Sequence, residues 1–336
     1  MRLRHTTDDC PGFTRKKRGN DFAYFDSSGR RIRDPAVLER IQSLAIPPAY
    51  EDVWICPDPR GHLQATGRDA KGRKQYRYHP QWRRLRDFGK FERMASFGFA
   101  LPAMRRRVGH DLATSGLPRK KVLALIVRIL DQTAIRIGNE SYVTQNGHFG
   151  LTTLRERHVR IENGNLELHF RAKGGQRCKL QLKDRRVTNI IRRMHRLPGQ
   201  RLFRYRDEHG RLRPVDSGAV NHYLQEHMGE AFTAKDFRTW TGTLEAAMRL
   251  AELPYDPHMS ERKRRQLLNQ VVQEVAEVLR NTPEVCRRAY IHPAIFEAWA
   301  SGHLQQAMAG VSGSRTRHAE WVVAGLLDKL EGGSRR

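Results

Sequence analysis

Cysteine is scarce in this chain of 336 residues, and its distribution excludes several classes of small protein. The sequence has no CxxC pair and therefore indicates neither a zinc ribbon nor a disulfide framework; its four cysteines are Cys10, Cys56, Cys178 and Cys286. Among the 15 histidines, only His222 and His227 stand near ligand spacing, and no cysteine or carboxylate pair completes a site. We interpret these two as ordinary helix residues and predict no metal site.

Long apolar runs are also absent. The longest, residues 122–127 and 322–327, are far shorter than the ~20 residues that a bilayer-spanning helix needs. The first ten residues, MRLRHTTDDC, lack the apolar core of a signal peptide. No GxxxxGK[ST] loop occurs, and no GxGxxG follows a strand pattern, so we expect no nucleotide cofactor. These absences predict a cytoplasmic protein without a membrane partner.

Positive charge is what the chain has in excess. Lys and Arg number 62 against 36 Asp and Glu, for a net charge of +26, and residues 1–90 carry +9 while residues 91–336 carry +17. With 38% hydrophobic residues and 27 aromatic side chains, the chain can bury a core and is not a disordered polycation. An excess of this size over both regions favours a polyanionic partner bound through counterion release, and nucleic acid is the first candidate.

The length and the turn signals predict two domains. Residues 1–90 combine Gly, Pro and aromatic residues with short alternating runs at 22–25, 52–56 and 75–78, which is typical of a small β-rich domain with one helix at Pro35–Ser43. Residues 81–89 form a basic segment that we interpret as a hinge or linker helix. Residues 91–336 form the second domain.

Helical spacing dominates the second domain, and one meander interrupts it. Apolar residues repeat at helical intervals from Val122 to Thr133, and further helices are predicted over 216–227, 236–252 and Glu261–Leu279. Thr282-Pro283 and His292-Pro293 each mark the start of a helix. Alternation over 158–170 around Asn163-Gly164 indicates a hairpin, and the turn Lys173-Gly174-Gly175 leads into a third strand over 177–182. The fold class is therefore α+β.

Four polar clusters stand out in this second domain. Arg136 comes at the end of an otherwise apolar helix, Lys173 lies at a hairpin tip, and Arg238 belongs to the start of a helix, where phosphate is favoured. The fourth cluster begins at Asn281 and reaches Tyr290. Each has an ordinary structural interpretation, as a salt-bridged helix end, a solvated turn, a capping segment or a core tyrosine. Their occurrence together makes these ordinary interpretations less favoured than they are for any one cluster alone.

The order Arg, Lys, Arg, Asn, Tyr resembles the catalytic set of type IB DNA topoisomerases, specifically the compact poxvirus and bacterial members. The matching segments are RIGNESY around Arg136, FRAKGGQ around Lys173, KDFRTW around Arg238 and NTPEVCRRAYIHP around Tyr290. GRDAKGRKQYRYHP in the first domain resembles the family's DNA-contacting segment. The resemblance runs from about Gly12 to Pro293 and implies a β-rich DNA-binding domain before a mainly helical catalytic domain, whose fold is shared with tyrosine recombinases.

The residue types suit the activity that this resemblance implies, relaxation of supercoiled duplex DNA through a 3′-phosphotyrosyl intermediate. Attack by Tyr290 conserves the phosphodiester bond energy for resealing. Nearby cations must favour its phenolate, because tyrosine is a poor nucleophile at its usual pKa of about 10. Arg136 and Arg238 would hold the non-bridging oxygens, and the resemblance makes Lys173 the proton donor to the leaving 5′-hydroxyl, either alone or in a relay with Arg136. These cations take the place of a metal ion, and supercoil strain removes the need for ATP.

Asn281 departs from the family pattern, in which poxvirus and eukaryotic members have His and some bacterial members have Asn. An amide can donate a hydrogen bond to a phosphate oxygen but cannot carry charge or transfer a proton. The sequence therefore favours a hydrogen-bonding role at this position and argues against a required general base.

The resemblance also implies residues that contact DNA outside the reacting centre. In the first domain Gln75, Tyr76 and Tyr78 match a segment that approaches the major groove, where Gln can pair with adenine; the two tyrosines could equally pack one face of a strand. In the second domain the matches are Asn139, Tyr142 and Lys235. Asn139 replaces a lysine of poxvirus members.

The nearest rival is a tyrosine recombinase or integrase, which uses similar residues on the same fold. Recombinases usually carry His three residues before the second Arg, where this chain has Lys235, and they precede the catalytic domain with a helical domain rather than a β-rich one. A non-catalytic DNA-binding clamp would have little reason to keep Lys173, Arg238 and Tyr290 together. We therefore predict a topoisomerase that acts as a monomer on duplex DNA, associated with the nucleoid.

Overall fold

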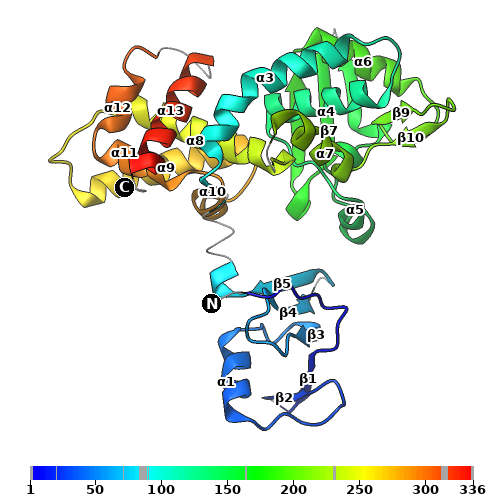
Figure 1. The fold of residues 1–336 in the computed structure, drawn as a ribbon, viewed down its shortest axis with the longest axis vertical. Helices are drawn as coiled ribbons and strands as arrows, with labels where there is room; N and C mark the ends of the chain where they lie inside the picture. The colour runs from blue at the N-terminus through cyan, green and yellow to red at the C-terminus, as the bar shows by residue number, and fades with distance from the viewer. Residues whose placement is uncertain are drawn as a thin grey trace. The chain divides into compact units, whose positions relative to one another are not determined.

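The structure is a computed structural model that describes residues 3–19, 21–70, 72–82, 89, 91–162, 165–229, 232–311 and 317–333, with the backbone alone at 141, 142, 145, 332 and 333. It divides into two compact units, Met1–Gly89 and Lys90–Arg336 (Figure 1). The predicted linker helix falls largely on residues 83–88 and the turn Asn163-Gly164 on 163 and 164, so both lie outside the described residues.

The first unit is built on a five-stranded antiparallel sheet with the strand order β2-β1-β3-β4-β5. Three of its strands cover the alternating runs that predicted them, within one residue at each end. The elements are β1 (Phe13–Arg18), β2 (Asp21–Phe25), α1 (Pro35–Ser43), β3 (Glu51–Ile55), β4 (Leu63–Arg68) and β5 (Lys74–Tyr78).

Helix α1 supplies the core of this unit and confirms its prediction residue for residue. Asp34 caps it by accepting the Ala36 N–H at 2.9 Å, and Pro35 occupies the first turn, where its missing N–H costs nothing. Ile41 on its inner face is buried with Val53, Ile55 and Ala65 of the sheet.

The composition of the basic run Arg15–Arg18 suggests a fully solvated segment. The run instead lies in β1, and Arg15 is engaged with the rest of the unit. Arg15 donates hydrogen bonds to the carbonyl oxygens of Ile46 at 3.2 Å, Pro47 at 3.0 Å and Tyr50 at 2.6 Å. Its guanidinium therefore satisfies the backbone of the loop between α1 and β3, which is a structural role.

The second unit is mainly helical and carries two small sheets. Its helices are α3 (Met94–Ala113), α4 (Arg119–Thr133), α5 (Glu140–Asn146), α6 (Arg185–His195), α7 (Ser217–Met228), α8 (Ala234–Glu252), α9 (Glu261–Leu279), α10 (Pro283–Ala289), α11 (Pro293–Ala300), α12 (His303–Met308) and α13 (Arg317–Gly333). Its strands are β6 (Val159–Glu162), β7 (Asn165–Arg171), β8 (Arg177–Leu182), β9 (Arg204–Arg206) and β10 (Leu212–Pro214). None of the described helices combines the length and apolarity needed to cross a bilayer.

Helices α4 and α8 form the interior of this unit, and α8 carries Lys235 and Arg238. Nearly every position of α4 from Val122 to Leu130 is buried. On α8, Phe237 and Trp240 pack around Phe97 of α3, with ring centroids 5.1 and 6.3 Å from its ring. In Figure 1, α8–α13 gather on one side of α3, and α4, α6, α7 and the strands lie on the other.

The meander is an antiparallel sheet with the order β6-β7-β8 and one buried face. Leu166, Leu168 and Phe170 of β7 lie opposite Leu182, Leu180 and Cys178 of β8, and all six side chains are buried. Positions 167, 169 and 171 therefore point to the other face. The turn between β7 and β8 is a single 3₁₀ turn at Lys173–Gly175, where the sequence predicts a turn.

The remaining helix predictions are confirmed, with one correction. Helices α7–α10 begin and end within two residues of the predicted positions, and α11 begins at Pro293, as predicted. Helix α4, however, ends at Thr133, and Ala134 adopts a left-handed conformation with φ 48°. Arg136 consequently lies beyond the helix, in a segment without regular structure, rather than in its last turn.

Candidate active site

Tyr290 lies at the C-terminal end of the short helix α10. Thr282 caps the start of α10 by accepting the Val285 N–H, and Pro283 follows it. At the other end the Tyr290 N–H donates to the carbonyl of Cys286 at 2.9 Å, and the tyrosine leaves the helix with φ −134°. Its side chain is 9% exposed.

Helix α8 holds the backbone of Tyr290 from the opposite side. The buried hydroxyl of Thr243 donates to the Tyr290 carbonyl at 3.4 Å and accepts the His292 N–H at 3.0 Å. Gly242 makes the close approach possible, because a Cβ atom there would stand 2.5 Å from the Tyr290 carbonyl oxygen. The segment that carries the tyrosine is thus fixed before and after the residue itself.

Arg238, also on α8, faces the ring of Tyr290. Its guanidinium carbon lies 4.9 Å from the ring centroid, and the residue is only 4% exposed. One terminal nitrogen donates to the carbonyl of Ala134 and the other donates to the carbonyl of Leu279 at 2.8 Å. Its Nε is buried and has no hydrogen-bond partner in the described part of the chain.

The two carbonyls that Arg238 binds belong to the C-terminal ends of α4 and α9. Each of these helices ends in a non-glycine residue with a positive φ, Ala134 at 48° and Arg280 at 51°. A cation at a helix C-terminus pairs with unsatisfied carbonyls and with the negative end of the helix dipole. Arg238 therefore joins the segment that leads to Arg136 with the one that leads to Asn281.

Arg136 lies two residues after Ala134, in a segment secured by backbone contacts. Its carbonyl accepts the Leu151 N–H at 2.9 Å. Gly138 and Gly150 approach so closely that a Cβ on Gly150 would lie 2.4 Å from the backbone of Gly138. Burial and then the charge of Arg238 lower the pKa of Arg136, while the charge of Tyr290 and a hydrogen bond with it act in the other direction; arginine remains charged in proteins.

These cations change the acidity of Tyr290. Burial by itself would raise the pKa of the phenol, but Arg238, through its charge and a hydrogen bond, outweighs burial together with Arg136 and Lys235. The pKa of Tyr290 therefore lies below its usual value. The phenolate, the nucleophilic form, is favoured relative to a free tyrosine.

Lys173 completes the group from the tip of the β7–β8 hairpin. Its side chain is exposed, and Gly174 and Gly175 take φ values of 82° and 77° that the tight turn requires. One pocket of about 480 Å³, the active-site pocket, is lined by Tyr290 and the three predicted catalytic cations. Its lining includes Arg136, Asn139, His148, Lys173, Ser217, Asn221, Lys235, Arg238 and Tyr290.

Asn281 is not among the residues that line the active-site pocket. Its Oδ1 accepts the Thr282 N–H at 3.0 Å, which fixes the orientation of the amide. Its Nδ2 is buried and has no hydrogen-bond partner among the described residues. The donor that the sequence analysis assigns to this position is thus present and unused.

Two of the three predicted DNA contacts of this unit can be located in the active-site pocket. Lys235 and Asn139 line the active-site pocket. Tyr142 lies in α5, and its side chain is outside the described residues.

The predicted contacts of the first unit all lie on β5. Gln75 donates its amide to Asp69 at 2.9 Å, and the Tyr76 and Tyr78 rings stack with centroids 6.2 Å apart. Tyr76 is nevertheless 45% exposed, so the stacked pair leaves one aromatic face accessible.

Three polar residues of the active-site pocket were missed by the sequence analysis: His148, Ser217 and Asn221. Ser217 and Asn221 stand one turn apart on α7, a spacing that alone signals nothing. Asn221 also accepts the Ala234 N–H at 3.0 Å and so positions the first turn of α8. Within the described part of the chain, no group of three or more His, Cys, Asp or Glu could hold a metal ion.

A tyrosine of lowered pKa, set among three cations in one pocket, has the composition needed to attack a phosphodiester and to stabilise the charge that develops. Comparison with known proteins agrees. A family model described as the catalytic core of eukaryotic DNA topoisomerase I matches residues 79–330, and one described as the N-terminal domain of bacterial DNA topoisomerase IB matches residues 21–69.

Individual relatives lead to the same family. DNA topoisomerase 1B of Acanthamoeba polyphaga mimivirus is 35% identical over 237 residues, which cover 69% of this chain and 70% of that protein. DNA topoisomerase 1B of vaccinia virus (strain Copenhagen) is 22% identical over 278 residues, or 79% of this chain and 82% of that protein.

The chain belongs to the type IB DNA topoisomerases. It is an isomerase that binds DNA and relaxes supercoils, which confirms the topoisomerase prediction over its recombinase alternative.

Proposed function

We propose that Tyr290 is the nucleophile of this topoisomerase. Its phenolate oxygen attacks the scissile phosphorus, the bond to the 5′-oxygen breaks, and the products are a 3′-phosphotyrosyl linkage and a free 5′-hydroxyl strand. The phenol proton passes to water. After strand rotation the 5′-hydroxyl attacks the same phosphorus and releases Tyr290. The convergence of Tyr290, Arg136, Arg238 and Lys173 on one pocket carries this assignment.

In this proposal Arg136 and Arg238 bind the non-bridging phosphate oxygens. Arg238 is desolvated and held in place by the two carbonyls that its Nη atoms bind, and its Nε, which has no partner among the described residues, is a further donor that would serve a phosphate. A fixed donor in a low-dielectric site stabilises developing charge without having to reorganise. Both arginines also lower the pKa of Tyr290.

Lys173 acts as the general acid. Its position at the tip of an exposed turn lets a long side chain reach the leaving oxygen, and its Nζ proton converts the 5′-oxyanion into a hydroxyl. The same group takes that proton back during resealing. Lys173 is therefore charged before cleavage and neutral in the covalent intermediate until it is reprotonated.

Asn281 supplies a hydrogen bond rather than a proton. Its Oδ1 is engaged by the Thr282 N–H and its buried Nδ2 is unpartnered among the described residues, so Nδ2 is the atom that would donate to a phosphate oxygen. An amide cannot serve as a base.

The remaining assignments concern DNA outside the reacting centre. Lys235 and Asn139 contact the backbone beside the active-site pocket, and Tyr142 extends that surface. In the first domain, residues 1–90, Gln75, Tyr76 and Tyr78 of β5 contact the major groove. The catalytic domain covers residues 91–336. The enzyme acts as a monomer without ATP or metal, in the cytoplasm on nucleoid DNA.

The test is relaxation of supercoiled plasmid in EDTA without ATP, followed by a detergent quench. The unsubstituted protein should relax the plasmid and leave protein on the 3′ end of a nicked strand. Tyr290→Phe should do neither, because it lacks the attacking oxygen. Tyr255→Phe, which removes the hydroxyl of an exposed tyrosine outside the active-site pocket, is the matched control and should keep both activities. Relaxation by Tyr290→Phe at the unsubstituted rate would assign the nucleophile elsewhere.

A further inference from the structure

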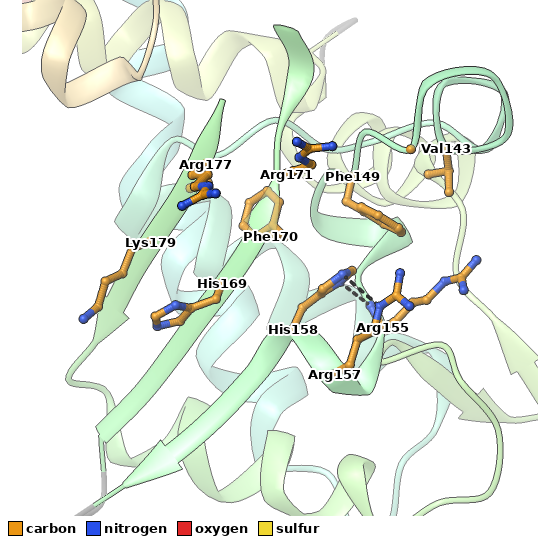
Figure 2. A pocket seen from close by; sticks show the side chains of 12 residues that line it. Val143, Phe149, Arg155, Arg157, His158, His169, Phe170, Arg171, Arg177 and Lys179 are labelled. Carbon is orange, nitrogen blue, oxygen red and sulfur yellow. Dashed lines mark hydrogen bonds between the residues drawn. The ribbon is translucent and has the colours of Figure 1, made fainter. Parts of the chain in front are cut away.

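A second pocket, larger than the active-site pocket and rich in basic side chains, lies beside the β6–β8 sheet (Figure 2). We call it the basic pocket; its volume is about 690 Å³. Phe149 and Phe170 are prominent apolar residues of its lining. Its cations are Arg155, Arg157, Arg171, Arg177 and Lys179, and His158 and His169 also line it.

No carboxylate lines the basic pocket in the described part of the chain. Glu167, on the neighbouring β7 position, pairs with His169 at 2.8 Å and lies 3.6 Å from Lys179, so it partly neutralises one end. Arg171 and Arg177 have no ion pair with any described acid. The end of the pocket that holds these two arginines therefore keeps its full positive charge.

The sheet register places the two arginines in an unfavourable position for an isolated protein. Arg171 of β7 lies directly opposite Arg177 of β8. Like charges at opposed positions of an antiparallel pair destabilise the sheet. Such a pair is explained if a polyanion occupies the face that both side chains share.

The cations on the other wall contact one aromatic ring and a neutral amide: Arg155 also donates a hydrogen bond to Gln200 Oε1 at 3.1 Å. The guanidinium carbons of Arg155 and Arg157 lie 5.7 and 5.9 Å from the centroid of Phe149. His158 accepts the Arg155 N–H at 3.0 Å, and burial together with both arginines lowers its pKa to about 4, so it stays neutral. In Figure 2 Arg155 and Arg157 lie on one side of the pocket, and Arg177 and Lys179 lie on the opposite side. The guanidinium groups are positioned without an acid in the described pocket lining to neutralise them.

The basic pocket adjoins the active-site pocket. Phe149 lines both, and Arg171 and Arg177 closely flank the turn that presents Lys173. Arg171 precedes Lys173 by two positions, a distance of about 7 Å along extended backbone. A duplex whose scissile phosphate reaches Lys173 therefore passes beside these arginines.

We propose that the basic pocket is a second phosphate-binding site, which holds the phosphodiester backbone of duplex DNA next to the scissile step. The inference rests on the proposed function, since Lys173 locates the DNA. Guanidinium groups without acid partners suit phosphate oxygens, and they carry no base preference. The site retains DNA through counterion release and takes no part in bond breaking.

The test measures the salt dependence of DNA binding. In a Tyr290→Phe background, which prevents cleavage during the measurement, the affinity for a short duplex is followed from about 50 to 200 mM salt. Arg171→Gln/Arg177→Gln should bind more weakly, and the slope of log Kobs against log salt should become shallower by about 1.8, because each phosphate that is no longer neutralised accounts for about 0.9. Its melting temperature should not fall, because the substitution removes a like-charged pair.

Two further variants distinguish a localised phosphate-binding site from a general effect of the protein's net charge. Arg171→Lys/Arg177→Lys keeps both charges and should keep the steep slope. Arg193→Gln/Arg196→Gln removes the same charge from exposed positions of α6 and the residue after it, outside both pockets, and should also keep the slope. A slope for Arg171→Gln/Arg177→Gln equal to that of unsubstituted protein overturns the proposal, and so does equal flattening by the α6 pair.

Failure of the proposed function has a different signature. Protein with an intact Tyr290 could relax plasmid and form the covalent adduct, while Arg171→Gln/Arg177→Gln has the same salt slope as its parent. In that case only the basic pocket is misassigned. If no adduct forms at Tyr290, the catalytic assignment is wrong whatever the slopes show.

Discussion

The catalytic unit holds positive charge in two contrasting ways. In the active-site pocket Arg238 is almost fully buried, and its terminal nitrogens bind two helix carbonyls. In the basic pocket Arg171 and Arg177 project from strand positions whose side chains are exposed. The first arrangement fixes a charge away from water, and the second presents charge to it.

This contrast distinguishes the arginine that we expect to act in bond breaking from the arginines that we expect to hold the DNA. A desolvated, fixed cation interacts strongly with a developing charge and is little screened by salt. Exposed cations are screened, and their contribution to DNA affinity falls as salt rises. Substitutions in the active-site pocket should therefore change rates at saturating protein, and substitutions in the basic pocket should change salt dependence.

Arg238→Gln gives the largest expected effect on this comparison. Removing one electrostatic donor should slow single-turnover cleavage by about 10²–10³ at saturating protein. The carbonyls of Ala134 and Leu279 would no longer have a charged partner, so the free energy of unfolding should fall by about 1–3 kcal/mol. Rapid-quench cleavage and thermal melting measure the two effects. If the variant cleaves normally but has a shallower salt slope, Arg238 contributes to DNA binding, as Arg171 and Arg177 do, rather than to bond breaking.

Thr243→Val sharpens the comparison without altering any charge. The variant lacks the hydroxyl that binds the backbone of Tyr290 and His292, so the nucleophile is positioned less well, and cleavage should slow by about tenfold. DNA affinity in the Tyr290→Phe background should not change. Thr243→Ser restores the hydroxyl and should recover most of the rate; if it cleaves as slowly as Thr243→Val, packing of the methyl group matters instead.

Lys235→Gln should give the smallest effect, a displacement of the pH profile. Cleavage needs the phenolate, so the rate rises with pH through the pKa of Tyr290, which Lys235 helps to lower. Without that cation the pKa rises, and the rising limb of the profile should move to higher pH by less than about one unit. Single-turnover cleavage at saturating protein across pH measures it. A uniform drop at every pH would instead indicate weaker engagement of the DNA.

Local signals located much of the fold because they act within a few residues. Thr282-Pro283 predicted the start of α10, and the two glycines after Lys173 predicted the turn. Helix α3 was not delimited, since Gly98 and Pro102 lie inside it. A Cβ at position 98 would stand 2.4 Å from the Trp240 ring, so close packing against α8 requires this glycine. That partner is distant in sequence.

The same limit applies to the two pockets. The four main residues of the active-site pocket could be named from family motifs, but His148, Ser217 and Asn221 join it only through tertiary packing. In the sequence alone, Arg171 and Arg177 are not distinguishable from other outward-facing residues of a hairpin. Their significance depends on the register that opposes them and on the absence of a carboxylate from the pocket lining that the structure describes.

The hydrogen bonds from Arg238 to two helix carbonyls have a consequence for local unfolding of the active site. One guanidinium closes the ends of α4 and α9, so fraying of either end releases the other. The amides after Ala134 and around Asn281 should then exchange with solvent in a single opening event, as one cooperative unit of the native state. Opening of this unit would therefore remove the support of Arg238 at the same time as that of the segments that lead to Arg136 and Asn281.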